Sequence, residues 1–180
     1  MTADCMVEDK RWDVLIDAAA RVLRERPATQ FWLVGGEQSR SSVRPALEAQ
    51  VAERGIADRF HFLGFRDDVP ALMRQTDILA SPSRHEGMGR VNVEAMVAGK
   101  PVIGSAGTGI AEVIVDGETG LLVDPTDTDA LADCLVRLAA DSSLRARMGA
   151  AGRARAAAEF DQDRQLDKVL DELRAIADST

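Results

Sequence analysis

The chain has 180 residues, of which 46% are hydrophobic, so it is long enough to bury the core of one domain of ordinary size. Its 22 basic and 30 acidic residues give a formal net charge of -8, which disfavours general binding to nucleic acid or to anionic lipid. Any site for an anionic ligand must therefore be a local one.

Few residues suggest a disulfide, a membrane segment or a metal site. The two cysteines, Cys5 and Cys134, occur in a chain with no apolar signal segment and no run of ~20 apolar residues. We therefore expect a cytoplasmic protein with reduced cysteines and no transmembrane segment. His61 and His85 lack the ligand spacing of a metal site, so no metal and no other cofactor is expected.

Short apolar runs alternate with helical patterns along the chain. Strands are predicted at residues 31–34, 59–63, 78–80, 101–103 and 121–123. Helices are predicted at residues 13–24, 43–54, 69–73, 90–98, 111–115, 126–140, 142–159 and 161–177. Only eight residues, Thr2 to Asp9, are left for a first strand, which we expect to be shortened or lost. The alternation predicts an α/β, Rossmann-like parallel sheet flanked by helices.

Residues 81–102, which read SPSRHEGMGRVNVEAMVAGKPV, organise the rest of the chain. They lie between two predicted strands and indicate a loop followed by a helix. Gly87 and Gly89 keep the loop from closing into helix, so the helix is expected to begin near Arg90. Glu86 then belongs to the loop and Glu94 to the helix, and the two carboxylates should serve different ligand groups.

The start of this helix suits a phosphate or pyrophosphate, because its first N–H groups lack partners and its dipole is positive there. Glu94 lies about 6 Å further along the axis, where a carboxylate can accept hydrogen bonds from a ribose. Glu86, at the carboxyl end of the preceding strand, is left to face the group attached to the far phosphate.

Glu86 and Glu94, followed by residues 95–102, resemble the E-x7-E signature of the retaining glycosyltransferase family 4, whose donor-binding half has the GT-B fold. Similar segments lie at residues 10–18, 31–36, 62–64, 116–123 and 147–149, so the resemblance covers nearly the whole chain. It implies that residues 1–180 form the C-terminal, donor-binding domain and that the N-terminal acceptor domain is absent. The implied reaction is metal-independent, retaining transfer of a sugar from a nucleoside diphosphate to an unknown acceptor.

The resemblance also implies roles for particular residues. Lys10 would approach the diphosphate as a point charge and Glu86 would hold the donor sugar, so both are predicted catalytic residues. The other predicted donor-binding residues are Glu94, Gly35, Gly36, Gly64, Phe65, Gly87, Met88, Gly89, Arg90 and Val91. Each of these roles has a simpler structural alternative. Lys10 could be an exposed lysine at a helix start, Gly35 and Gly36 could only form a tight turn, and Phe65 could be a core residue. Arg90 stands where the family more often has an apolar residue, and both phosphate contact and simple solvation remain open.

Two further patterns suggest ligands but have better explanations. Residues 104–109, GSAGTG, suggest a dinucleotide fingerprint, yet their spacing is wrong and the helix that follows is short. Residues 127–129, DTD, resemble a metal-binding D-x-D, yet they open a helix, where the dipole favours acids. A helix cap is therefore the preferred interpretation of the second pattern.

Other functions and partners remain open at the sequence level. A non-catalytic nucleotide-sugar-binding module is favoured by the missing half and by Cys5, which stands where the family has an Arg. An epimerase half on the same superfold is a third hypothesis. An apolar stripe on the last predicted helix should pack on this domain, on a separate N-terminal half or on a second copy, and it consists of Leu166, Val169, Leu170, Leu173 and Ile176.

Overall fold

The computed structural model describes residues 1–3, 8–36 and 43–160. The strands are β1 (Thr2–Ala3), β2 (Phe31–Val34), β3 (Phe60–Gly64), β4 (Leu79–Ser81), β5 (Val102–Ser105) and β6 (Gly120–Val123). The helices are the 3-10 turn η1 (Glu8–Lys10), α1 (Trp12–Glu25), α2 (Arg44–Glu53), α3 (Val69–Gln75), α4 (Arg90–Val97), α5 (Ile110–Val113), α6 (Thr128–Ala140) and α7 (Ser142–Glu159). Cys5 and the predicted helix at 161–177 lie outside the described residues.

The sheet is parallel throughout the described part of the chain, with neighbours β1-β2-β3 and β4-β5-β6. The Met1 amino group donates to the Ile78 oxygen at 2.8 Å, and the Ala80 N–H donates to the Met1 oxygen at 2.9 Å. These two bonds have the pattern of a parallel ladder and join β1 to β4. The strand order is therefore β3-β2-β1-β4-β5-β6, that of a Rossmann sheet, and the predicted fold class is confirmed.

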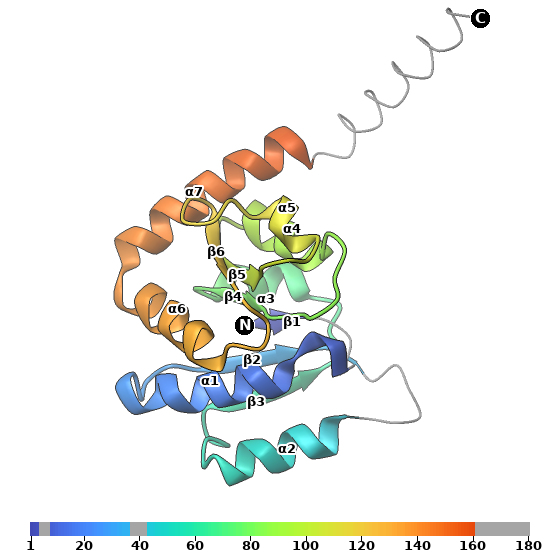
Figure 1. Cartoon of the computed structure of the whole chain (residues 1–180), viewed down its shortest axis with the longest axis vertical. Helices are drawn as coiled ribbons and strands as arrows, with labels where there is room; N and C mark the ends of the chain where they lie inside the picture. The colour runs from blue at the N-terminus through green and yellow to red at the C-terminus, as the bar shows by residue number, and fades with distance from the viewer. Residues whose placement is uncertain (4–7, 37–42, 161–180) are drawn as a thin grey trace, which may run out of the picture.

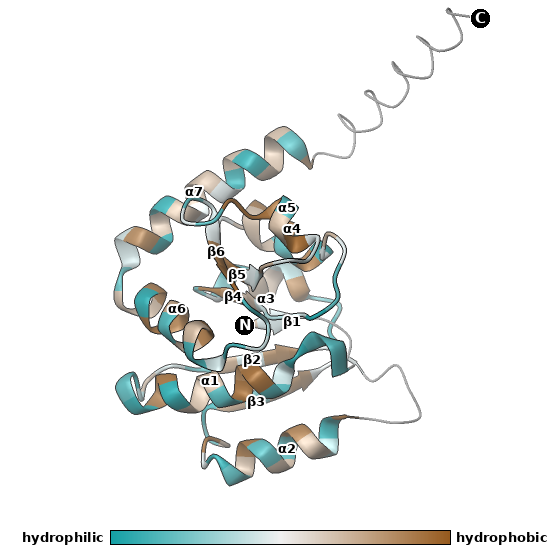
Figure 2. Cartoon of the chain, in the orientation of Figure 1, coloured by the Kyte–Doolittle hydropathy of each residue, from teal (hydrophilic) through white to brown (hydrophobic). Residues whose placement is uncertain are grey.

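Helices cover both faces of the sheet, and each face has its own apolar core (Figure 1). Residues of α1, α2 and α6 pack on one face, and residues of α3, α4 and α5 pack on the other. Adjacent strand residues alternate between the cores, since Leu79 belongs to one and Ala80 to the other. Figure 2 shows hydrophobic residues along β2 and β6, while the outer surfaces of the helices carry hydrophilic ones.

Close backbone packing and a side-chain cap fix the helices that surround the sheet. A Cβ added to Gly149 of α7 would lie 2.0 Å from the Gly99 oxygen, so glycine is required where α7 crosses the end of α4. The Asp127 carboxylate accepts a hydrogen bond from the Ala130 N–H at 2.8 Å at the start of α6. The cap interpretation of residues 127–129 is confirmed. No helix in the described ranges has the length and apolar character needed to cross a membrane.

Candidate functional site

The 3-10 turn η1 and the loop after β4 meet at the carboxyl edge of the sheet. The chain proceeds from β1 to one side of the sheet and from β4 to the other, so a crevice for ligands is expected outside these two strand ends. The Arg84 N–H donates to the Asp9 oxygen at 2.7 Å. His85 Nδ1 lies 3.2 Å from Asp9 Oδ1. These contacts hold η1 against the loop that follows β4.

Lys10 and Glu86 form an ion pair at this junction. The Lys10 ammonium donates a hydrogen bond to Glu86 Oε2, although the two residues are 76 positions apart in the sequence. Their side chains are only 11% and 17% exposed, so each charge depends on close partners for its stability. The fold thus brings the two predicted catalytic residues together, and the interpretation of Lys10 as an exposed lysine is wrong.

The loop from Glu86 to Gly89 leads into an uncapped helix start. Gly89 is the N-cap residue of α4, with a φ of 62° and no side-chain cap, so the N–H groups of Arg90 and Val91 have no intrahelical partner, whereas the Asn92 N–H donates to the Gly89 oxygen at 2.8 Å. The Gly109 N–H donates to the Glu86 oxygen at 2.9 Å. A Cβ on Gly109 would lie 2.3 Å from the Gly87 oxygen. This loop is therefore held tightly against the turn before α5.

The remaining predicted residues of this stretch occupy different environments. Arg90 is largely exposed, and its Nη2 lies 3.8 Å from Glu94 Oε1 on the outer side of α4. Met88 is half exposed beside the helix start. The Val91 side chain is buried in the core under α4, so only its backbone N–H can reach a ligand at the helix start.

Gly35, Gly36, Gly64 and Phe65 form a second group at the carboxyl ends of β2 and β3. The Gly35 N–H donates to the Gly64 oxygen at 2.8 Å. A Cβ on Gly36 would lie 3.4 Å from the Phe65 Cβ. The Phe65 side chain is 81% exposed, so the interpretation of Phe65 as a core residue is wrong, and the ring is available for contact.

Sequence reasoning missed two residues beside the ion pair. Arg11 has a left-handed backbone with a φ of 52°, which is uncommon for a residue other than glycine, and its Nη1 is buried without a hydrogen-bond partner. Asn92 is fully buried, and neither polar atom of its amide has a partner. A polar residue on the same α4 face as Ala95 and Met96 is the signal that could have identified Asn92.

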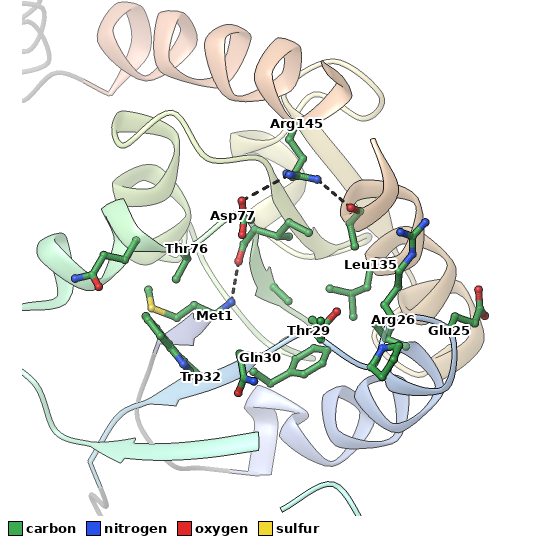
Figure 3. Close-up of a pocket in the computed structure, with 18 residues that line it drawn as sticks. Met1, Glu25, Arg26, Thr29, Gln30, Trp32, Thr76, Asp77, Leu135 and Arg145 are labelled. Atoms are coloured by element: carbon green, nitrogen blue, oxygen red, sulfur yellow. Dashed lines mark hydrogen bonds and ion pairs between the residues drawn. The ribbon is translucent and has the colours of Figure 1, made fainter. Parts of the chain in front are cut away.

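A cavity of about 710 Å³ lies at the opposite, amino edge of the sheet (Figure 3). Arg145 reaches across it: its Nη1 donates to the Leu138 and Ala139 oxygens at 2.6 and 3.1 Å, and its Nη2 lies 3.7 Å from Asp77 Oδ1. Burial lowers the pKa of the Met1 amino group to about 5, and the nearby Asp77 carboxylate opposes this shift. No predicted site residue lines this cavity.

Comparison with known proteins assigns the chain to a family. The family model described as "Glycosyl transferases group 1" matches residues 5–155. The chain belongs to this family. It is 30% identical to the lipopolysaccharide core biosynthesis glycosyltransferase LpsE of Rhizobium meliloti, over 94% of this chain and 48% of LpsE. It is 39% identical to the D-inositol 3-phosphate glycosyltransferase of Salinispora tropica, over 88% of this chain and 34% of that protein.

Solved structures place the fold among the GT-B glycosyltransferases. Anabaena HepE, crystallised with UDP and glucose, superposes with a TM-score of 0.90 and 30% identity, over 97% of this chain and 47% of HepE. The C-terminal domain of the group 1 glycosyltransferase LpcC of Francisella tularensis superposes with a TM-score of 0.81 and 28% identity, over 90% of this chain and 84% of that domain. The chain therefore has a C-terminal-type domain of the family and spans half or less of LpsE and HepE.

Proposed function

We propose that this chain binds a nucleoside-diphosphate sugar and provides the donor half of a retaining, family 4 glycosyl transfer. Residues 1–180 would form the donor-binding domain, with the acceptor held mainly by another domain. One observation carries the proposal: Lys10 and Glu86 form an ion pair outside the carboxyl ends of β1 and β4, beside the uncapped start of α4. Such a crevice outside the carboxyl ends of the strands is where Rossmann-type sheets bind nucleotides.

The diphosphate would be bound by Lys10 and by the first N–H groups of α4. As the bond between sugar and phosphate breaks, negative charge grows on the leaving phosphate. A fixed ammonium and the positive end of a helix stabilise that charge without a metal ion. In the described residues no three Cys, His, Asp or Glu side chains come together to hold a metal. Metal independence is part of the proposal, and the experiment below tests it.

Glu86 would hold the hydroxyl groups of the donor sugar. In the present structure its carboxylate is engaged by Lys10, so a bound donor would give both groups new partners. The phosphates accept hydrogen bonds from the Lys10 ammonium, and the sugar hydroxyls donate to Glu86. The new hydrogen bonds are charge-assisted, like the ion pair that they replace, so the exchange leaves neither charge without a partner.

The nucleoside would extend along α4 and towards the ends of β2 and β3. The Glu94 carboxylate is 45% exposed on α4 and can accept hydrogen bonds from the ribose. Gly35, Gly36, Gly64 and the exposed Phe65 would contact the base through backbone and ring. HepE contains UDP and glucose, whereas a relative in Mycolicibacterium smegmatis, 34% identical over 82% of this chain, is named as GDP-mannose-dependent. We therefore propose the donor class without choosing its base or sugar.

Calorimetry with UDP, GDP, UDP-glucose and GDP-mannose in excess chelator tests this proposal. At least one nucleoside diphosphate should bind without metal, and its sugar derivative should bind with Glu86 engaged. Glu86→Gln keeps the shape but removes the charge, so it should weaken the nucleotide sugar about tenfold and leave the bare diphosphate no weaker. Equal loss of both ligands would mean that Glu86 has a structural role. Binding only after Mg²⁺ addition would contradict metal independence.

Transfer assays then separate an enzyme half from a binding module. The chain alone should transfer sugar poorly, because transfer needs an acceptor held close to the anomeric carbon and water kept away from it. Adding a compatible N-terminal half should raise the rate. Robust transfer by the chain alone would contradict the division of roles. Donor binding without any transfer in the reconstituted protein would favour the non-catalytic module.

A further inference from the structure

Asn92 is a buried amide with no partner in a part of the fold that must accommodate a ligand. It is the third residue of α4 and, like Ala95 and Met96, is fully buried. Its Nδ2 and Oδ1 make no hydrogen bond in this structure. Folded proteins pair nearly all buried polar groups, so two unpaired atoms on one side chain indicate that the amide has a use in another state.

The Asn92 amide lies beside the stem of Glu86. Both approach the point where a Cβ on Gly89 would stand, Asn92 Nδ2 at 2.4 Å and Glu86 Cγ at 3.1 Å. The two atoms are therefore separated by no more than the sum of these distances. Since the carboxylate oxygens lie two bonds beyond Cγ, rotation about the side-chain bonds of Glu86 can bring them to Nδ2. Glycine at position 89 leaves the space that this amide occupies.

We propose that Asn92 is the second hydrogen-bond partner of Glu86, used when a diphosphate engages Lys10. This inference rests on the proposed donor site. In the present structure the Glu86 carboxylate is paired with Lys10, and its side chain is only 17% exposed. Phosphates that attract the ammonium leave a poorly solvated carboxylate beside further negative charge, which is unfavourable. The Asn92 Nδ2 group then donates to Glu86 and satisfies a buried donor at the same time.

Asn92 is thus a positioning residue, because it acts on the donor through Glu86 and touches neither phosphate nor sugar. Its hydrogen bond lowers the free-energy cost of leaving the Glu86 carboxylate without Lys10 when a diphosphate binds. It also holds Glu86 on the sugar side of the loop while Lys10 contacts the phosphates. A purely structural Asn92 would have neither effect.

Nuclear magnetic resonance of the 15N-labelled chain tests the partner exchange without requiring a ligand. Asn92→Leu, which keeps the branched shape and removes the polar atoms, identifies the side-chain amide signals of Asn92. Lys10→Met removes the first partner of Glu86, so these signals should move downfield and their hydrogen exchange should slow. Saturating UDP or GDP should move them in the same direction in the wild-type chain. If neither Lys10→Met nor a bound nucleotide moves them, the partner exchange is wrong.

A double-mutant cycle on the affinity for UDP or GDP supplies the second readout. Asn92→Leu should weaken the nucleotide about tenfold in the wild-type chain, the loss expected for a hydrogen bond to a charged group. In a Glu86→Ala background the same change should alter affinity less than twofold. Equal losses in both backgrounds, or no loss in either, would overturn the inference. If Lys10→Met moves the Asn92 signals but no nucleotide binds, the partner exchange stands and the proposed donor function fails.

Discussion

The two edges of the sheet place charged groups in opposite circumstances. At the carboxyl edge, the Lys10–Glu86 pair lies beside the uncapped start of α4, and in our proposal a ligand replaces the present partners of the pair. At the amino edge, Arg145 is bonded to the last carbonyl groups of α6 beside a cavity of about 710 Å³. Because the Arg145 guanidinium hydrogen-bonds the backbone, we expect it to stabilise the fold and not to bind a ligand.

The ligand site that we propose therefore does not coincide with the amino-edge cavity. The amino-edge cavity is lined mainly by strand starts and helix ends, and its Arg145 and Asp77 side chains form an ion pair. The carboxyl edge instead brings together the Lys10–Glu86 ion pair and the uncapped start of α4. We therefore expect substitutions at the carboxyl edge to change ligand affinity, and substitutions at the amino edge to change stability.

The largest expected effect on affinity follows Lys10→Ala. Removing the ammonium should weaken a bound nucleoside diphosphate by about 1.5–3 kcal/mol, the range for a hydrogen bond to a charged group. Lys100→Ala is the matched control, because Lys100 donates to the Arg74 oxygen near the amino end of β5. Calorimetry should detect little change in that variant. Equal losses for the two lysines would remove the distinction between the edges.

Gly149→Ala should have the largest effect on stability. Its new Cβ would meet the Gly99 oxygen at 2.0 Å, so α7 must move away from α4, at a cost of about 1–3 kcal/mol in the free energy of unfolding. On the same helix, the Cβ of Gly152→Ala would meet Met96 Cγ at 3.4 Å and the Thr119 oxygen at 3.6 Å, which are ordinary van der Waals contacts, so this variant should be nearly neutral. Urea titration measures both variants. Equal stability of the two variants would contradict the packing argument.

Glu94→Ala should reduce the affinity for a nucleoside diphosphate with an intact ribose by about tenfold, because the variant loses a charge-assisted hydrogen bond to the ribose hydroxyl groups. The 2′,3′-dideoxy analogue lacks the hydroxyl groups, so the same substitution should hardly affect its binding. Calorimetry on the four combinations gives the comparison. If both nucleotides lose affinity equally, Glu94 does not bind the ribose.

Arg145→Ala should have the smallest effect of these substitutions on the ligand. The variant loses the hydrogen bonds to the end of α6, and its free energy of unfolding should fall by about 1 kcal/mol. Affinity for the nucleotide should remain within twofold of wild type when measured well below the unfolding transition. A marked loss of affinity in the folded variant would place the ligand at the amino edge.

Local patterns predicted most of the fold and the placement of Glu86 and Glu94 in a loop and a helix. The strand at residues 31–34 and the helix start at Arg90 agree with the structure because they depend on short apolar runs and on glycine. The separation of Glu86 in the loop from Glu94 in the helix follows from the same signals and is confirmed.

The sequence could not reveal contacts that depend on the packing of distant segments. Lys10 meets Glu86 only because β1 lies beside β4, and the spacing of residues in the sequence does not indicate that these two strands are neighbours. The exposure of Phe65 depends on how the loop leaves β3, and the sequence alone does not distinguish this exposed ring from an aromatic residue of the core. Asn92 had a local signal in its apolar helix face, but its neighbour Glu86 became visible only in three dimensions.

Chemical-shift mapping of nucleotide binding tests the central claim most directly, because both edges report in one experiment. The labelled chain is titrated with UDP and with GDP in chelator, and the backbone amide signals are followed. We predict that the largest changes occur at Lys10, at residues 86–91 and at Gly64 and Phe65, with little change around Asp77 and Arg145. Changes concentrated at Met1, Asp77 and Arg145, with the carboxyl edge unaffected, would contradict the account.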